Sequence, residues 1–282
     1  MVPPLPIPLV ERAVSEALAE DLGLVGDVTT NATIPAGTTA RAVIAARRAG
    51  VVCGNALAEQ AFRALDPSIV YKVLKPDGAS AGPGDVIAEI SGPARAILTG
   101  ERVALNFMGR MSGIATLTQR YVAAVAGTKA SIVDTRKTTP GLRAFEKYAV
   151  RCGGGHNHRI GLFDAVLIKD NHIAAAGGIA AAVEAARGAC GHMVKIEVEV
   201  DTLAQLEAVM AYEVDAVLLD NMTPQMLQQA VAIVAGRALT EASGGVTLET
   251  VATIARSGVD LISVGALTHS APVLDLGLDF IG

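Results

Sequence analysis

Basic side chains gather in one short part of a chain that is otherwise acidic and apolar. Of its 282 residues 51% are hydrophobic, and its net charge at pH 7 is -5. The stretch DTRKTTPGLR, residues 134–143, nevertheless opens a segment, 134–172, that holds seven of the 23 Lys and Arg residues and three of the five His residues. Because oriented positive groups attract negative ligands, this segment predicts a site for an anion.

The types of basic residue indicate which anions the site suits. Arg carries a planar fork that binds a carboxylate through two parallel hydrogen bonds, so Arg136, Arg159 and Arg102 suit a substrate with several carboxylates. Lys is a compact point charge, so Lys137 and Lys169 suit a diphosphate or a carboxylate. The alternative for the whole cluster is a solvated basic face.

Two further groups in this segment are interpreted differently. His156 and His158 lie only two residues apart in the sequence HNH, after three glycines. We expect them to form hydrogen bonds or to position other groups rather than to bind a metal. Lys147 and Arg151 lie in LRAFEKYAVRC, which has helical periodicity, and we expect them at the surface.

The elements that must position these residues recur along the second half of the chain. Six short apolar runs are each followed by a helical pattern, which indicates βαβ units and a parallel sheet. No GxGxxG motif accompanies them, and the segment is short for an eight-stranded barrel of about 250 residues. We therefore expect a smaller or incomplete α/β barrel. The predicted strands are ASIVDT, DAVLIKD, VKIEVEV, DAVLLDN, ALTEASGG and LISVGA.

Acidic residues stand at the carboxyl ends of two of these strands. Active sites of α/β barrels lie at that end. Glu199 and Asp220 end consecutive strands, which in a sheet lie about 4.8 Å apart, so the two carboxylates can share a site. Together with phosphate oxygens they form the environment that Mg²⁺ prefers. The alternative is a pair of solvated acids, one of them paired with Lys169.

Glycine-rich loops follow the last two predicted strands. They are Ser243-Gly244-Gly245 and Val264-Gly265-Ala266, and each precedes a helical pattern. Backbone N–H groups in such loops bind phosphate, and late barrel strands often build a phosphate site in this way. Ordinary tight turns are the alternative. Taken together, these features predict an anionic substrate with carboxylates, a phosphorylated co-substrate and Mg²⁺.

The first half of the chain and its composition set further limits. Helical and strand patterns alternate between residues 1 and 110, which indicates a small α+β domain. We expect no membrane span, since no uninterrupted apolar run reaches about 18 residues. We also expect no secretion signal and, from the acidic charge, no binding of nucleic acid. The three cysteines are scattered, which favours neither a zinc site nor disulfides and makes the reducing cytoplasm the expected location.

The sequence resembles the quinolinate phosphoribosyltransferase family. The resemblance is strongest in the 40 residues DTRKTTPGLRAFEKYAVRCGGGHNHRIGLFDAVLIKDNHI. It continues, in order, through shorter motifs that cover most of the chain. These are EDLGLVGDVTT, GERVALNFMGRMSGIAT, EVEVDTL, LLDNM, ASGGV and SVGALTHS.

The resemblance implies an N-terminal α/β sandwich domain, residues 1–112, followed by an open or incomplete seven-stranded α/β barrel, residues 113–270. Residues 271–282 are expected to form a tail that packs on the first domain. The implied enzyme converts quinolinate and 5-phosphoribosyl 1-diphosphate into nicotinate mononucleotide, carbon dioxide and diphosphate, with Mg²⁺, in NAD biosynthesis. It is a homodimer with each site shared between subunits, and assembly into hexamers stays open.

The family's residue roles carry over onto matching positions of this chain. Arg136, Arg159 and Lys169 would hold the two carboxylates of quinolinate, with His158 beside them. Arg102 would come from the partner subunit. Further contacts and the catalytic roles follow the motifs. Thr135 would contact the substrate, Lys137, Glu199 and Asp220 would serve the phosphoribosyl donor and its Mg²⁺, and its 5-phosphate would bind Ser243, Gly244, Gly245, Val264, Gly265 and Ala266, near His269.

Two other functions stay open from the sequence. One is a relative of the same fold that uses nicotinate or is associated with molybdenum uptake. The three cationic residues Arg136, Arg159 and Lys169 favour a dicarboxylate over nicotinate. The other is a sensor that binds a sugar phosphate without catalysis, which would not need Glu199, Asp220 and Lys137 together.

Overall fold

The computed structural model describes residues 2–281, and these form two compact units. Unit 1 comprises residues 2–119, 145–154 and 271–281, and unit 2 comprises residues 120–144 and 155–270. The chain therefore passes from unit 1 to unit 2 and returns twice, once for a short helical stretch and once at its end. The helix α4 (Ala94–Ala124) contains residue 112, where the sequence indicated a domain boundary, and continues without a break beyond it.

Unit 1 is built on an antiparallel sheet of four strands in the order β12-β1-β5-β3. The last strand of the chain, β12 (Leu276–Ile281), pairs along the length of β1, with Arg41 opposite Ile281 and Ala46 opposite Leu276. The tail is thus an integral edge of this sheet. The other strands are β1 (Thr39–Ala46), β3 (Val70–Val73) and β5 (Val86–Pro93), with a separate two-stranded pair, β2 (Gly50–Val51) and β4 (Ser80–Ala81).

Helices α1 to α5 complete unit 1. The first helix follows Pro6, buries Val10, Val14 and Leu18 at a spacing of four, and ends at Gly23, which has a positive φ of 51°. Glycine adopts this positive φ without the steric cost that a Cβ would add. The core of the unit consists mostly of aliphatic side chains and includes the fully buried Phe62. The helices are α1 (Ile7–Leu22), α2 (Val28–Thr33), α3 (Asn55–Arg63), α4 and α5 (Arg143–Cys152).

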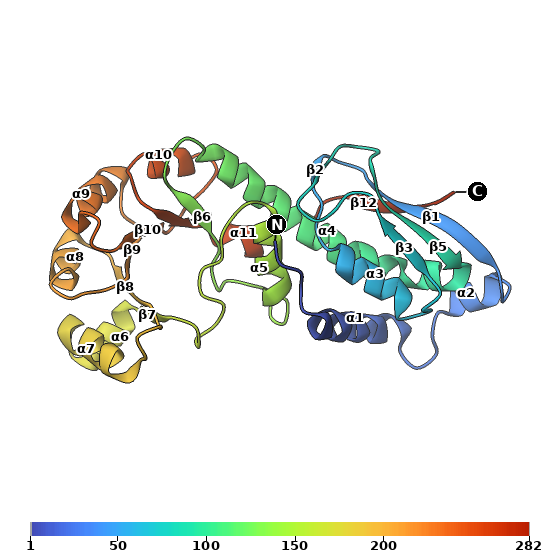
Figure 1. Cartoon of the computed structure of the whole chain (residues 1–282), viewed down its shortest axis with the longest axis horizontal. Coiled ribbons are helices and arrows are strands. Elements are labelled where there is room, and N and C mark those ends of the chain that lie inside the picture. The colour runs from blue at the N-terminus through green and yellow to red at the C-terminus, as the bar shows by residue number, and fades with distance from the viewer. Residues whose placement is uncertain (1, 282) are drawn as a thin grey trace. The chain divides into compact units, whose positions relative to one another are not determined.

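Unit 2 contains the six predicted parallel strands, and Figure 1 shows its helices around the outside of them. The strand order is β6-β11-β10-β9-β8-β7, so neighbours in space are neighbours in sequence except where β6 pairs with β11. The strands are β6 (Ser131–Val133), β7 (Val166–Ile168), β8 (Ile196–Val200), β9 (Ala216–Asp220), β10 (Leu239–Ser243) and β11 (Leu261–Ser263).

Two helices of unit 2, α8 and α9, start at recognisable side-chain caps. Thr202 and Gln205 form a capping box at α8, and the Thr223 hydroxyl accepts from the Met226 N–H at α9. Each cap satisfies a backbone donor that has no partner within the helix. The helices are α6 (Asp170–Ala176), α7 (Ile179–Ala189), α8 (Leu203–Val209), α9 (Pro224–Val234), α10 (Val251–Ala255) and α11 (Ala266–His269).

A seventh strand position exists beside β6, reduced to a single residue. His156 forms a parallel bridge with Val133, its N–H donates to Ile132 and its carbonyl accepts from Asp134. The order around the sheet is therefore His156-β6-β11-β10-β9-β8-β7, and no pairing between His156 and β7 is present in residues 2–281. This is an open α/β barrel, and it confirms the predicted fold class.

The strand register decides which side chains share the inner face of this barrel. Glu199 lies opposite Leu218, and Leu218 lies opposite Glu241 on the next strand. Since side chains alternate along a strand, Glu197 and Asp220 project to this same face. Three strands, β8, β9 and β10, thus deliver four acidic groups toward one interior.

Candidate functional site

The loop after β6 is fixed by a buried carboxylate. Asp134 is inaccessible to solvent, and its side chain accepts from the Asn157 amide at 2.6 Å and the His158 backbone N–H at 2.9 Å. Arg143 also binds this region, donating to the Thr138 hydroxyl at 3.0 Å and to the Ile160 carbonyl at 3.2 Å. Sequence patterns assign no role to Arg143; in the structure it ties two loops of unit 2 together.

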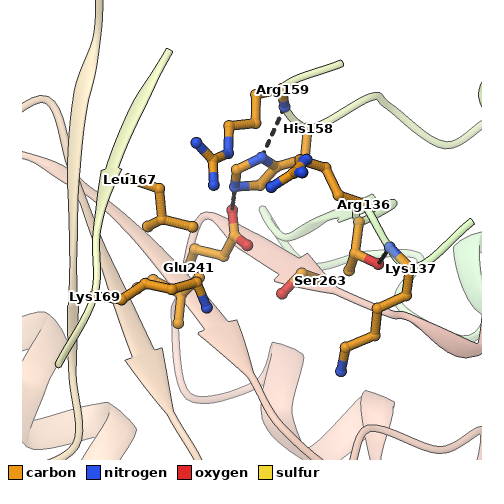
Figure 2. Close-up of a pocket in the computed structure, with 10 residues that line it drawn as sticks. Arg136, Lys137, His158, Arg159, Leu167, Lys169, Glu241 and Ser263 are labelled. Atoms are coloured by element: carbon orange, nitrogen blue, oxygen red, sulfur yellow. Dashed lines mark hydrogen bonds and ion pairs between the residues drawn. The ribbon is translucent and has the colours of Figure 1, made fainter. Parts of the chain in front are cut away.

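Six of the predicted residues line one pocket of unit 2, shown in Figure 2. They come from the loop after β6, the loop after the His156 bridge and the end of β7. Four other residues, which the sequence did not single out, form the rest of the wall. The lining consists of Thr135, Arg136, Lys137, His158, Arg159, Leu167, Lys169, Leu218, Glu241 and Ser263.

Two guanidinium groups enter this pocket, one on either side of the His158 ring (Figure 2). Burial, reinforced by the nearby positive charge of Arg136, lowers the pKa of Arg159. The Nε of Arg136 is buried and has no hydrogen-bond partner within residues 2–281. Like charges that are held together out of water favour an anion between them, so this pair fits the predicted carboxylate clamp.

His158 is held at both ring nitrogens. The Arg159 backbone N–H donates to Nδ1 at 2.7 Å, and Nε2 lies 2.9 Å from Glu197 Oε2 and 3.6 Å from Glu241 Oε2. A backbone N–H can only donate, so Nδ1 is the acceptor and Nε2 carries the hydrogen, which it gives to Glu197. Both ring nitrogens of His158 thus form hydrogen bonds within the protein.

Glu197 and Glu241 are two buried acids beside His158 that the sequence did not predict as site residues. Both side chains are buried, exposed by 10% and 1%, and each has one oxygen without a hydrogen-bond partner in the described chain. Burial and the neighbouring Glu197 raise the pKa of Glu241 to about 8, against the opposing effect of His158. Each lies two residues before a predicted site residue, Glu199 or Ser243, so the period of a strand could have revealed them.

The predicted acids Glu199 and Asp220 end neighbouring parallel strands on the same face, as the sequence indicated. In the structure Glu199 forms a 2.8 Å ion pair with Lys169, which is the alternative considered for these acids. Asp220 accepts from the side-chain amide of Asn221 at 2.6 Å. Lys169 therefore links the acidic strand ends to the pocket that it lines.

The loop after β10 has a backbone conformation that requires glycine at one of its positions. Gly244 has a φ of +93°, and a Cβ there would lie 2.1 Å from the Asn221 side-chain oxygen. Gly245, with a φ of +60°, has open space where its Cβ would be. Ser243 lies opposite Asp220, and its carbonyl accepts from the Asn221 N–H at 2.9 Å. The first glycine is thus required both by its conformation and by the close approach of Asn221.

The second glycine loop contacts the basic loop directly. A Cβ on Gly265 would lie 3.1 Å from the Lys137 side chain and 3.2 Å from the His269 ring. The Thr268 hydroxyl donates to the Lys137 carbonyl at 2.6 Å. Val264 and Ala266 flank this glycine at the start of α11. Lys137 and His269, which are distant in sequence, are thereby gathered around one backbone loop.

Arg102 lies on α4 in unit 1, where its side chain is 69% exposed and contacts Glu101 at 3.1 Å.

One expectation for unit 1 is wrong: Lys147 is not a surface residue but is only 3% exposed. The reason is that α5 buries most of its circumference within unit 1, so a polar position on it has little water to reach. No helix of residues 2–281 is long and apolar enough to cross a membrane.

Comparison with known proteins identifies the family. Residues 27–112 match the N-terminal domain, and residues 114–279 the C-terminal domain, of quinolinate phosphoribosyl transferase. A nicotinate-nucleotide pyrophosphorylase [carboxylating] of Mycobacterium leprae is 48% identical over 94% of this chain and 95% of the relative. A probable enzyme of the same name from Bacillus subtilis is 45% identical over 95% and 92%.

A solved structure agrees with these matches. The nicotinate-nucleotide pyrophosphorylase of Francisella tularensis superposes with a TM-score of 0.95 at 40% identity, covering 100% of this chain and 99% of the other. Sequence and fold thus lead to the same group of proteins over both units. The chain belongs to the quinolinate phosphoribosyltransferase family of enzymes.

Proposed function

We propose that the chain transfers the phosphoribosyl group of 5-phosphoribosyl 1-diphosphate to quinolinate, with loss of carbon dioxide. The products are nicotinate mononucleotide, carbon dioxide and diphosphate, and the reaction serves NAD biosynthesis. The observation that carries this proposal is the meeting of Arg136, Arg159 and Lys169 in one pocket of a chain that belongs to this family. Three cations around one cavity match a substrate with two carboxylates.

Quinolinate is held by its carboxylates. Arg136 and Arg159 grip them from two sides, and the ammonium of Lys169 adds a third positive charge. His158 acts behind this clamp, since its Nδ1 accepts from the Arg159 backbone and its Nε2 donates to Glu197. Thr135 supports the basic loop, because its hydroxyl accepts from the Lys137 backbone N–H at 3.0 Å. The clamp orients the pyridine nitrogen toward the sugar.

The phosphoribosyl donor occupies the acidic and glycine-rich side of the site. Lys137 faces its diphosphate, and the two glycine loops, with Ser243 and His269, face its 5-phosphate. Glu199 and Asp220 are hard oxygen ligands on neighbouring strands, so together with diphosphate oxygens they fit Mg²⁺. Bound there, Mg²⁺ would supply charge neutralisation for the leaving diphosphate.

The chain's own groups account for the course of the reaction. The pyridine nitrogen attacks ribose C1, and the C1–oxygen bond to diphosphate breaks, with Lys137 stabilising the departing negative charge. Glu199 or Asp220 stabilises the positive charge that develops on the sugar. The ring nitrogen is then a cationic pyridinium, which accepts the electron pair as the bond between C2 and its carboxylate breaks. Carbon dioxide leaves and C2 takes up a proton.

The quaternary structure and location complete the proposal. We place Arg102 in the active site of the partner subunit of a homodimer, where its exposed guanidinium would reach quinolinate. The reducing cytoplasm fits a chain whose described cysteines are all free thiols. Arg102→Ala would then reduce activity in a dimer, and mixing it with Arg136→Ala subunits would restore part of it, since hybrid dimers contain one intact site.

A single assay tests the reaction. The purified chain is incubated with quinolinate, phosphoribosyl diphosphate and Mg²⁺, while the absorbance of quinolinate and release of carbon dioxide are followed. Turnover of quinolinate with stoichiometric carbon dioxide supports the proposal. Turnover of nicotinate instead of quinolinate would assign the chain to the nicotinate-using alternative. No turnover of either would favour the relative associated with molybdenum uptake.

A further inference from the structure

Glu241 occupies the floor of the substrate pocket. It lies on β10, and its side chain lines the same cavity as Arg136, Arg159 and Lys169 (Figure 2). The side chain is only 1% exposed, and its Oε1 has no hydrogen-bond partner in residues 2–281. A buried polar atom without a partner is costly, so a group that binds in the pocket is the natural partner for this oxygen.

The surroundings of Glu241 favour its neutral, protonated form. Potential ligand atoms of Glu241, Glu197 and His158 all lie within 4.8 Å of one another. Two buried carboxylates at such separation cannot both ionise without a large electrostatic cost. The Nε2 hydrogen of His158 goes to the closer carboxylate, that of Glu197, which leaves Glu241 to carry a proton. The same hydrogen occupies Nε2 and disfavours a metal among the three groups.

We propose that Glu241 contacts the substrate directly, its carboxyl group donating a hydrogen bond from the pocket floor to a carboxylate of quinolinate. This inference rests on the proposed function. The three cations attract the dianion, and a neutral acid adds a directed donor without placing a negative charge against it. An ionised Glu241 would instead repel the substrate, so its proton is part of the binding site.

The pH dependence follows with a definite sign. Burial and the nearby Glu197 raise the pKa of Glu241 to about 8, and a more distant negative charge, Asp134, acts in the same direction. The binding form is the protonated one, so quinolinate affinity is complete below this pH and falls as the pH rises through it.

Two other groups that face Glu241 act on its pKa in the opposite direction. His158 and the hydroxyl of Ser263 oppose the rise. The remaining charged groups of the pocket are the cations Arg136, Lys137, Arg159 and Lys169. A fall in kcat/KM for quinolinate between about pH 7 and 9 is the expected sign of Glu241 in the free enzyme.

Two substitutions separate the role of the proton from that of the shape. Glu241→Gln keeps a neutral side chain that can donate, so quinolinate affinity near neutral pH stays within about threefold of the unaltered protein. The fall in quinolinate affinity between about pH 7 and 9 disappears, because the carboxyl group that ionises there has been removed. Glu241→Ala removes the donor and weakens quinolinate binding about tenfold. Affinity for phosphoribosyl diphosphate changes in neither variant.

The measurements are dissociation constants for both substrates, by calorimetry, and kcat and KM across this pH range. If the alanine variant unfolds, the measurements on Glu241→Gln are sufficient to test the proposal. A glutamine variant that binds quinolinate normally but loses turnover a hundredfold would make Glu241 a proton donor to C2 and overturn the proposal. So would an unchanged pH profile in that variant. Failure of the unaltered protein to use quinolinate would instead reject the proposed function.

Discussion

The backbone N–H of Arg159 donates a 2.7 Å hydrogen bond to Nδ1 of the preceding residue, His158, whose Nε2 hydrogen goes to Glu197. A chain of contacts thus leads from a buried carboxylate on β8, through a neutral imidazole, to the turn that carries an arginine of the clamp. The tautomer of the histidine is set by the fold, and we expect the histidine to act on the substrate through Arg159.

Replacing His158 should affect one substrate more than the other. In His158→Ala the turn at Arg159 loses its acceptor and Glu197 loses its donor, so we expect KM for quinolinate to rise about tenfold. KM for phosphoribosyl diphosphate should stay nearly constant. Steady-state kinetics with each substrate varied in turn check this, with the exposed His192→Ala as control. An equal rise in both KM values would contradict a role through Arg159.

Arg136→Ala should weaken quinolinate binding more severely. It removes one half of the guanidinium pair, and loss of a buried charged partner costs about two orders of magnitude in affinity. Binding of phosphoribosyl diphosphate, followed by calorimetry, should change little. The exposed Arg256→Ala, a matched change elsewhere on unit 2, should leave both affinities intact. Equal loss of both affinities in Arg136→Ala would remove Arg136 from the carboxylate clamp.

Gly244→Ala should destabilise the chain more than Gly236→Ala. Both glycines have positive φ, 93° and 75°, so both substitutions share a conformational cost of about 1 kcal/mol. Only Gly244 has a neighbour in the way, the Asn221 side chain at 2.1 Å from the new Cβ. Urea unfolding should show a larger loss for Gly244→Ala, and adding Asn221→Gly should recover part of it. Equal losses for the two glycines would show that the close approach does not matter.

A buried ion pair in unit 1 gives a test of stability. Arg110 donates to Glu146 at 2.6 Å, and the glutamate side chain is 1% exposed. Arg110→Met removes the arginine partner of this buried carboxylate, so we expect a loss of about 3–5 kcal/mol in the free energy of unfolding. The double variant Arg110→Met/Glu146→Leu should lose less, because no buried charge remains. Denaturant unfolding of the single and double variants measures these losses. Equal losses of unfolding free energy in the two variants would show that the unpaired charge is not the cause.

Removal of divalent metal should stop catalysis but not quinolinate binding. The proposed ligands of Mg²⁺, Glu199 and Asp220, lie on the donor side of the site, while the carboxylate clamp consists of protein cations. A chelator should therefore abolish turnover, and added Mg²⁺ should restore it. Asp220→Asn should raise the Mg²⁺ concentration needed for half-maximal activity. Quinolinate affinity that depends on the metal would contradict this division of the site.

The sequence predicts much of this site because its signals are local. Each strand is a short apolar run, and the groups at its end, such as Arg136 and Lys169, follow within a few residues. The common edge of a parallel sheet then brings these ends together. The six strands and six of the lining residues could be predicted in this way.

What escaped prediction depends on contacts between distant segments. Glu197 and Glu241 lie inside strands, 44 positions apart by their numbers, and only the register of β8, β9 and β10 shows that they share a face with His158. The burial of Lys147 depends on α5 leaving the barrel to join unit 1. Local periodicity can show which face of a strand carries Glu197 or Glu241, but not that these acids meet His158 or that Lys147 is buried.

The pairing of β12 with β1 has a consequence for biosynthesis. About 230 residues of chain separate the two strands, and all of unit 2 is translated between them. Until β12 emerges from the ribosome, β1 presents an edge of unpaired N–H and C=O groups, the kind of surface on which other strands assemble. Unit 2 can close during translation, whereas unit 1 is completed last, so premature termination near residue 275 would release an aggregation-prone product with an intact substrate pocket.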